Sequence, residues 1–263
     1  PASNPTTEAR PALASSFLAG PDGSVGIARQ GRNHGREKRL LLFLKGHIMA
    51  YSTPAGTKFY VSSTFASVKT ASNVTNGNPA VVTSVSHGYV DGNEVLVLSG
   101  WEEINEMVVT VNQTSADAFE LMSVNTSDTT LHVADGGDSS TFALISSWLE
   151  IPQVLTLSPS GGDMRQVNIN PVGRRNGIVL PDGFNASTIA FTIGHDVSLT
   201  NWATLQNISR TQTKVAYKSV KPNGATTYAY GYFIMSEVVK QASGQADFVD
   251  ASLFALGRTI SYA

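Results

Sequence analysis

The stretch from residue 214 to residue 233, KVAYKSVKPNGATTYAYGYF, specifies a β-hairpin and so points to a strand-rich fold. Pro222 fixes the entry to the turn, and Asn223-Gly224 can supply the positive φ angles of a tight turn. On both sides of the turn larger side chains recur at every second residue, with alanine or glycine between them, which is the period of a half-buried strand. We therefore predict a hairpin with one aromatic and one nearly bare face, the larger side chains being Val215, Tyr217, Tyr228, Tyr230 and Tyr232.

The rest of the chain from Thr57 onward also consists mainly of short strand-like segments. They include TKFYVSSTF, IPQVLTLSPS, RQVNINPV, GIVLPDGF and STIAFTIGHD. The exception is SLTNWATLQNISR, in which apolar residues recur every third position behind Ser198, a possible N-cap. This spacing predicts a short amphipathic helix from about Leu199 to Ser209. We expect a mainly β protein, a β-sandwich with one short flanking α-helix.

Composition excludes several classes of protein. The 263 residues are 41% hydrophobic and 14% charged, which suits a folded chain. Because the chain has no cysteine, it has no disulfides, thiolate metal sites or cysteine nucleophiles. It also has no run of about 18 apolar residues, so we expect no membrane insertion.

The net charge of −2 conceals three pieces of different charge. Residues 1–48 contain seven Lys/Arg and three Asp/Glu, whereas residues 79–148 contain ten Asp/Glu and no Lys/Arg. The remaining residues, 49–78 and 149–263, contain eleven Lys/Arg and seven Asp/Glu. This segregation indicates a basic N-terminal segment, an acidic module and a nearly neutral body.

The basic segment, residues 1–48, is rich in Pro, Gly and Ser and reads as disordered or extended. Its cluster GRNHGREKR suits either a contact with nucleic acid or another anionic surface, or a solvated charge cluster. A third interpretation is that translation begins at Met49, where MAYSTPAGTKFYVSSTF resembles a protein start. Peptides from residues 1–48 in the mass spectrum of the mature protein would exclude that start.

The acidic module, residues 79–148, has its own apolar alternation and an Asp91-Gly92 turn, and it interrupts the body between two strands. Insertions of this kind are tolerated where the two ends of the inserted unit lie close together. We therefore predict a small, independently folding β domain at residues 79–148. The body is then residues 49–78 and 149–263.

No catalytic, metal-binding or cofactor-binding residues are predicted. His87, His132 and His195 show no metal-ligand spacing, and no nucleophile elbow or phosphate-binding glycine loop follows a strand. We interpret the His195-Asp196 pair as part of a turn in which Asp196 caps the next helix. The segment ADGGDSS, residues 134–140, lacks the spaced oxygen ligands and closing Glu of a calcium loop, so it reads as a turn.

The segment VGRRNG, residues 172–177, falls where a hairpin tip is expected. Arg174 and Arg175 suit two roles there. They can grip a carboxylate on another subunit through bidentate hydrogen bonds, or they can keep an exposed tip soluble.

The order of these parts resembles the tail tube proteins of long, non-contractile-tailed bacteriophages. The resemblance runs from Met49 to Ala263 and is carried by GTKFYVSSTF, an insertion opening NGNPAVVTSVSHGYVDGNEV, WLEIPQVLTLSPSGG, STIAFTIGHD, the NWATLQ helix and the KPNGATTYAYGYF hairpin. The insertion is separately similar to the small β-barrel domain of ubiquitin-activating enzymes. That similarity implies shape only, because a chain without cysteine cannot form the thioester of those enzymes.

The resemblance implies a structural protein of the virion tail, assembled in the bacterial host cytoplasm. Its sandwich would close into hexameric rings that stack around a tape-measure protein, between tail-terminator and distal-tail proteins, and duplex DNA would pass through non-specifically. The sequence does not indicate which sheet face meets the lumen. We expect the acidic module to lie outside the tube, because ten acidic residues in each copy would repel one another at close quarters.

Assembly requires contacts within and between rings. For stacking we favour the excursion from Ser160 to Phe184, with Arg174 and Arg175 at its tip, and the residues that follow Met49. The predicted inter-subunit contacts are Met49, Tyr51, Arg174, Arg175, Tyr228, Tyr230 and Tyr232. Two alternatives stay open: a distal-tail or baseplate ring protein, and a carbohydrate-binding β module.

Overall fold

The computed structural model describes residues 18–19, 25–26, 55–241, 243–244 and 246–263. The chain divides into two units, residues 1–53 and 54–263. The first contains the short antiparallel pair β1 (Leu18–Ala19) and β2 (Val25–Gly26). Otherwise the predictions for residues 1–48, and for contacts by Met49 and Tyr51, lie outside the described residues. All other elements belong to the second unit.

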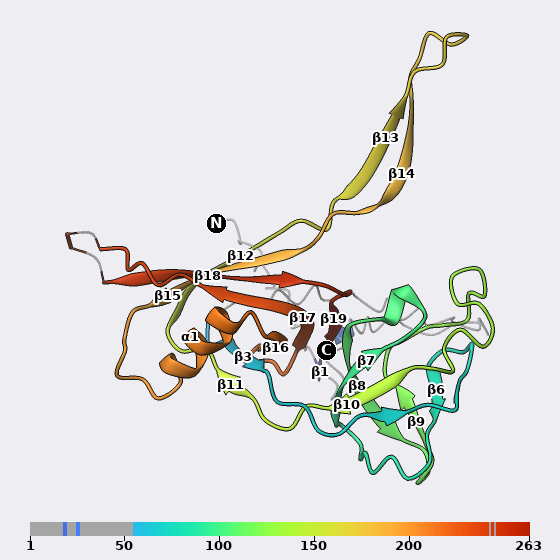
Figure 1. Cartoon of the computed structure of the whole chain (residues 1–263), viewed down its shortest axis with the longest axis horizontal. Helices are drawn as coiled ribbons and strands as arrows, with labels where there is room; N and C mark the ends of the chain where they lie inside the picture. Colours follow the sequence, from blue (N-terminus) through green and yellow to red (C-terminus); the bar gives the residue numbers. More distant parts are fainter. Residues whose placement is uncertain (1–17, 20–24, 27–54, 242, 245) are drawn as a thin grey trace, which may run out of the picture. The chain divides into compact units, whose positions relative to one another are not determined.

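The body contains an eight-stranded sheet, here called the main sheet, in which every neighbouring pair of strands is antiparallel. Figure 1 shows these strands crossing the centre of the view. The long strand β17 pairs with β16 along one side and with β18 and β19 along the other. In spatial order the strands are β11 (Leu149–Glu150), β3 (Lys58–Ser62), β16 (Lys214–Val220), β17 (Thr226–Met235), β18 (Phe248–Ala255), β15 (Thr188–Gly194) and β12 (Val154–Ser160), with β19 (Ile260–Tyr262) beside β17.

The main sheet curls around its core so that its two halves face each other. Phe191 of β15 lies with its ring centroid 5.8 Å from that of Tyr217 in β16 and 6.2 Å from that of Phe59 in β3. In the sheet, β17 and β18 separate β15 from β16, so these contacts cross the core rather than follow the hydrogen bonds. The mainly β prediction is therefore confirmed, and the two layers of the sandwich are halves of one curled sheet.

One helix, α1 (Trp202–Thr211), closes this core, as predicted, and it buries Trp202, Leu205 and Ile208. Its start differs from the prediction, because the N-cap residue is Asn201 and no side chain caps it. Ser198 instead donates its backbone N–H and its hydroxyl to Asp196 Oδ1, at 3.0 and 2.6 Å. The prediction that Ser198 or Asp196 caps the helix is therefore wrong, because these two residues form hydrogen bonds with each other in a turn before the helix.

The predicted hairpin is present as β16 and β17, but the prediction of one aromatic face is wrong. Tyr217 lies opposite Ala229, and Lys218 lies opposite Tyr228. Directly opposed residues share a face in an antiparallel pair, so Tyr217 and Tyr228 point to opposite faces. The reason is the five-residue loop between Val220 and Thr226, which shifts the alternation of β17 by one residue relative to β16. Neither face is bare.

A second sheet of seven strands lies within residues 69–144 and is here called the insert. It curls around a separate core that contains Trp101, Phe119 and Phe142. The sheet begins before residue 79, and the predicted domain boundaries at residues 79 and 148 stay predictions. The strands β4 and β5 form its two ends and are not paired with each other among the described strands, so the predicted closed barrel also stays a prediction. In spatial order its strands are β4 (Lys69–Thr70), β10 (Thr141–Leu144), β7 (Glu94–Leu98), β8 (Met107–Gln113), β9 (Ala118–Leu121), β6 (Ala80–Thr83) and β5 (Asn73–Val74), with the short helix η1 (Glu102–Ile104) between β7 and β8.

Candidate subunit-contact surfaces

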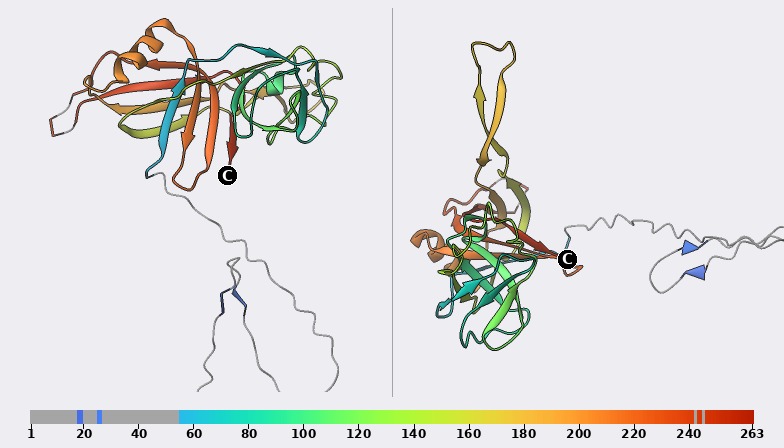
Figure 2. Two further views of the ribbon diagram at one scale, coloured as in Figure 1. Left: turned by 90° about the horizontal axis from the view of Figure 1, so that it is seen from below. Right: turned by 90° about the vertical axis from the view of Figure 1, so that its right-hand side faces the viewer.

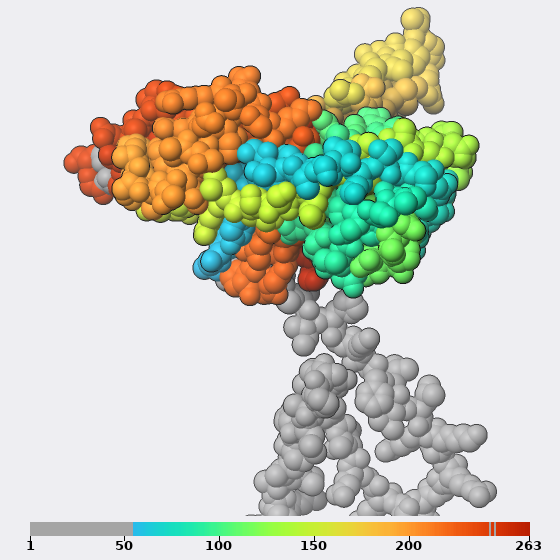
Figure 3. Space-filling view, turned by 60° about the horizontal axis from the view of Figure 1, so that its bottom comes forward, coloured from blue at the N-terminus to red at the C-terminus, as the bar shows by residue number. Residues whose placement is uncertain are grey.

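A two-stranded hairpin, here called the arm, extends from the main sheet between β12 and β15. It consists of β13 (Met164–Ile169) and β14 (Ile178–Phe184), which form a sheet of their own. Figure 2 shows it projecting from the body, and Figure 3 shows its atoms standing clear of the packed surface. Every residue of β13 is exposed, and only Ile178 of β14 is partly buried. Among the described strands, β13 and β14 pair only with each other, and an isolated two-stranded ribbon is marginally stable in water.

The arm has one aliphatic face. Val167 pairs with Leu180, and Ile169 pairs with Ile178, which places all four side chains on the same side of the ribbon. The opposite side carries Asn168 opposite Val179 and Gln166 opposite Pro181. Val167, Ile169 and Leu180 are each at least 40% exposed. Contiguous exposed apolar area of this kind is typical of protein contact sites.

The base of the arm is fixed by polar contacts and by a glycine. Arg165 donates from Nε and from Nη2 to the carbonyl oxygen of Asp182, at 2.9 and 2.7 Å. Gly161 has a φ of +81°, and a Cβ there would lie 2.0 Å from the carbonyl oxygen of Ala186, in the segment that connects β14 to β15. Only glycine fits this position, because the conformation is left-handed and the two chains approach closely.

The tip of the arm is the loop between Ile169 and Ile178, which contains the predicted tip residues 172–177. Arg174 and Arg175 are exposed there, and Arg174 donates its backbone N–H to the carbonyl oxygen of Pro171 at 3.1 Å. The hairpin tip is therefore where the sequence predicted it. The predicted contact of the two arginines with another subunit stays a prediction.

The strand β12 forms a second candidate surface at one edge of the main sheet. It pairs with β15 on one side, and no described strand pairs with its other side. Leu155 and Leu157 of this strand are 57% and 41% exposed. An unpaired edge with uncovered leucines is a liability in an isolated chain and a ready template for pairing with another chain.

The tyrosines that were predicted to contact other subunits have different surroundings. Tyr228 and Tyr230 are buried within the chain, where they pack with Leu96 and Val108 of the insert. Tyr232 is half-buried, with its ring centroid 5.9 Å from Lys214 Nζ. The burial of Tyr228 and Tyr230 gives them a packing role inside the protomer. Their part in contacts between subunits stays untested.

Glu94 of the insert receives three hydrogen-bond donors of the body. Lys218 Nζ lies 3.0 Å from Oε1 and 3.2 Å from Oε2, the Tyr228 hydroxyl donates to Oε1, and Trp148 Nε1 donates to Oε2. The Lys218 ammonium also lies 4.4 Å from the ring centroid of Trp148. The side chains of Glu94 and Lys218 are 17% and 16% exposed. Burial, followed by the hydrogen bond to Glu94, raises the pKa of Tyr228 far above its ordinary value.

Two further ion pairs join the insert to the body. Lys214 Nζ lies 2.7 Å from Glu106 Oε1, and Arg258 Nη1 lies 2.7 Å from Glu103 Oε2. In each case, as with Glu94, the insert provides the carboxylate and the body provides the cation. The acidic charge of the insert is therefore partly neutralised by the body on which it packs, which the charge pattern alone did not indicate.

His87, His132 and His195 contact backbone carbonyl oxygens or an aromatic ring of the folded chain. His87 Nε2 lies 3.1 Å from the carbonyl oxygen of Ser115, and His132 Nδ1 lies 3.1 Å from that of Asp128. The ring of His195 packs edge-on against Trp202. Within the described residues, no group of three or more His, Asp or Glu side chains is placed to hold a metal ion. No helix in the described part of the chain is long and apolar enough to cross a membrane.

The exposed arm and the side of β12 that no described strand pairs with are features typical of β proteins that associate with other chains. Comparison with known families specifies the class further: the chain belongs to the phage tail tube protein (TTP) family, whose model matches residues 99–263. The match begins inside the insert and covers more than half of the chain. No curated protein shows significant similarity to it. The family is structural and non-enzymatic, and it places the chain in the tail of the phage virion.

Sequence reasoning missed Glu94, Lys218 and the aliphatic face of the arm. The alternation in RQVNI, where Val167 and Ile169 are separated by a polar residue, carried the signal for that face. The insert carboxylate and its lysine partner are 124 residues apart, and no local pattern connects them.

Proposed function

We propose that this chain forms hexameric rings that stack into the tail tube, the conduit through which the phage genome leaves. The aliphatic face of the arm carries this proposal, because Val167, Ile169 and Leu180 are exposed on a ribbon whose strands pair with no other described strand. A neighbouring subunit that covers this face supplies the apolar burial that a stable contact needs. Tube assembly around a tape-measure protein, between terminator and distal-tail proteins, belongs to the same proposal.

Two surfaces suit the two directions of assembly. The arm stands away from the body with Arg174 and Arg175 at its tip, which suits a contact with the next ring. The unpaired side of β12, with Leu155 and Leu157 uncovered, suits a lateral contact within the ring, where closure removes the free edge. Arginine at the tip favours a carboxylate partner, because its planar guanidinium matches a carboxylate through two parallel hydrogen bonds.

Electron microscopy of the concentrated protein tests the proposal directly. We expect tubes of indefinite length from the unaltered chain. The double variant Arg174→Glu, Arg175→Glu is expected to stay soluble and folded, with an unchanged thermal midpoint, and to form no tubes. The matched control Lys58→Glu, Lys221→Glu makes the same change of net charge at exposed positions outside the arm and is expected to form tubes.

Three results would count against the proposal. Single closed rings from the unaltered chain would favour a distal-tail or baseplate ring protein. Single subunits at every concentration would contradict self-assembly. Normal tubes from the arginine double variant would show that the arm tip is not needed for the contact between rings.

A further inference from the structure

The main sheet has two outer faces that point away from each other. Phe191 of β15 meets Tyr217 of β16 and Phe59 of β3 across the core, so these side chains point inward from opposite halves of the curled sheet. Because successive residues of a strand point to opposite sides, the neighbours of these residues point outward from each half. The outer face of β12, β15 and β18 is thus on the side of the core opposite to the outer face of β3 and β16.

The outer face of β16 and the adjoining part of β17 is covered. Ala216, Tyr228 and Tyr230 lie on it and are buried with Leu96 and Val108 of the insert. Glu94 and its three donors hold the insert in this position. The insert therefore marks one side of the curled sheet, and the outer face of β12, β15 and β18 is on the other side.

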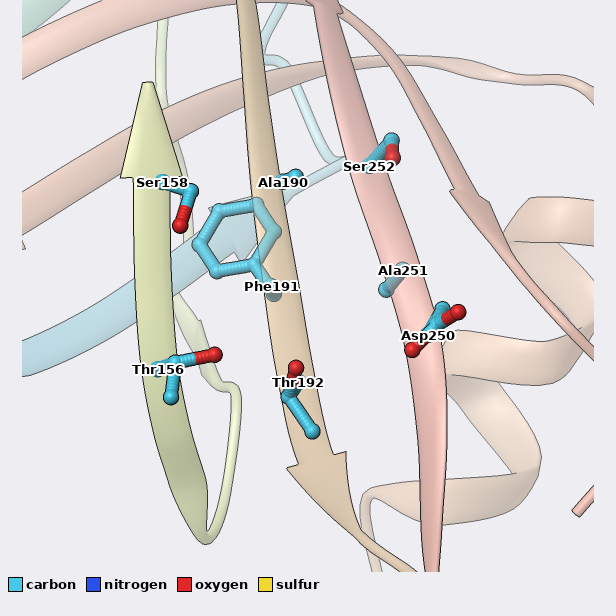
Figure 4. Close-up of a pocket in the computed structure, with 8 residues that line it drawn as sticks. All are labelled: Thr156, Ser158, Ala190, Phe191, Thr192, Asp250, Ala251 and Ser252. Atoms are coloured by element: carbon cyan, nitrogen blue, oxygen red, sulfur yellow. The ribbon is translucent and has the colours of Figure 1, made fainter. Parts of the chain in front are cut away.

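That second outer face, here called the open face, is lined by small and mostly hydroxyl-bearing side chains. Figure 4 shows them on three neighbouring strands, around a shallow hollow of about 250 Å³. Two large apolar side chains lie on the same face at the two ends of β18: Phe254, which is opposite Thr188 and 46% exposed, and Phe248, which is opposite Gly194 and partly buried. The residues of the open face that line the hollow are Thr156, Ser158, Ala190, Thr192, Asp250 and Ser252.

The open face offers no unpaired cation within the described residues. The strands β12, β15 and β18 contain neither lysine nor arginine. Two lysines lie beside the face, and both are paired: Lys240 Nζ lies 2.5 Å from Asp250 Oδ2, and Lys214 Nζ lies 2.7 Å from Glu106 Oε1. Duplex DNA carries one phosphate charge per about 1.7 Å, and proteins bind it non-specifically through unpaired Lys and Arg. The open face thus lacks the groups that would retain DNA.

We propose that the open face lines the channel of the tube and faces duplex DNA in transit, with the insert on the outside. This inference rests on the proposed function. A contact between subunits is the competing use of the face, but the buried centre of such an interface is apolar, whereas this face carries hydroxyls and a carboxylate. The arm and the leucines of β12 provide the apolar area that subunit contacts require.

The absence of cysteine allows a clean accessibility test. Ser252→Cys places one thiol on the open face, and Thr129→Cys places one on the exposed surface of the insert. Each variant is reacted with a small maleimide and with a maleimide coupled to a large globular protein, both as free subunits and as assembled tubes. Ser158→Cys provides a second position on the open face should Ser252→Cys disturb assembly.

In free subunits we expect both thiols to react with both reagents. In tubes we expect Thr129→Cys to keep reacting with both. We expect Ser252→Cys to react with the small reagent but at least about 10-fold more slowly with the protein-coupled one, because that reagent reaches the channel only at the tube ends.

Equal reaction of both thiols with the protein-coupled reagent in tubes would overturn the assignment, because the open face would then be on the outside. Protection of Ser252→Cys from the small reagent as well would also overturn it, because the face would then be buried between subunits. Failure of the unaltered chain to form tubes would instead contradict the proposed function. The failure of the proposed function is therefore distinguishable from the failure of the channel assignment.

Discussion

Glu94 of β7 and Lys218 of β16 form a largely buried ion pair across the boundary between the insert and the main sheet, with Lys218 Nζ 3.0 Å from Glu94 Oε1. The same carboxylate accepts hydrogen bonds from Tyr228 and Trp148. One side chain of the insert thereby holds three groups of the body. This carboxylate therefore helps to fix the orientation of the insert on the sheet.

Replacement of Glu94 by Ala is expected to lower the free energy of unfolding by about 3–5 kcal/mol, because it leaves the Lys218 ammonium without its charge partner in a largely buried position. Urea denaturation followed by tryptophan fluorescence measures the change. The matched control is Glu237→Ala, which removes one partner of an ion pair with Arg210 whose side chains are 56% and 61% exposed. That variant is expected to lose much less stability, because an exposed ion pair is screened by water and salt. Equal losses from the two variants would contradict the role given to Glu94.

Stability at alkaline pH is expected to depend on Tyr228. Burial and the hydrogen bond to Glu94 raise its pKa above the ordinary value of 10.0, so the folded state retains the phenolic proton that the unfolded state releases. This stabilisation is complete below pH 10 and is lost as the pH rises above 10. We expect the thermal midpoint of Tyr228→Phe to fall less between pH 9 and about pH 11 than that of the unaltered chain. An identical fall in both proteins would refute the assignment.

The aliphatic face of the arm is expected to control assembly without affecting folding. The double variant Val167→Thr, Leu180→Thr places threonine, a β-branched residue that suits strands, at both positions but adds hydroxyls to the face that a neighbouring subunit would bury. We expect an unchanged thermal midpoint for the free subunit and at least a 10-fold higher concentration threshold for tubes, measured by light scattering. Gln166→Thr, Asn168→Thr alters the opposite face and is expected to leave the threshold within about twofold.

Gly231 in β17 is expected to tolerate no side chain. A Cβ at this position would lie 1.9 Å from the carbonyl oxygen of Phe254, in the adjacent strand β18. Gly231→Ala should therefore destabilise the subunit by about 1–3 kcal/mol or more, because two central strands must separate. Gly173 at the arm tip has no atom within 4 Å of an added Cβ, so Gly173→Ala is expected to stay within about 0.5 kcal/mol of the unaltered chain. Denaturant midpoints of the two variants provide the comparison.

The existence of most elements follows from local sequence, because alternation and turn residues act over a few positions. The arm is an example, since VGRRNG separates two alternating segments and forms the tip between Ile169 and Ile178. The face of each tyrosine was not predictable in the same way. It depends on the number of loop residues between β16 and β17, and a change of one residue there reverses every side chain of the second strand.

Contacts between the insert and the body were the least accessible to sequence reasoning. Nothing near Glu94 indicates Lys218 as its partner, because the pairing arises only when the insert folds back onto the main sheet. The burial of Tyr228 and Tyr230, which we predicted as contacts between subunits, was not predictable for the same reason, since the insert covers them within the protomer. The acidic module was visible in the sequence, but not that its carboxylates pair with cations of the nearly neutral body.

The narrow base of the arm, where Gly161 passes close to Ala186, has a mechanical consequence. A strand of six residues is about 20 Å long, so a rotation of about 10° at that base displaces the tip by about 3–4 Å. If the arm joins successive rings as proposed, the rings can tilt against one another while each tip keeps its contact. Long tails would then bend under load without opening a gap in the wall.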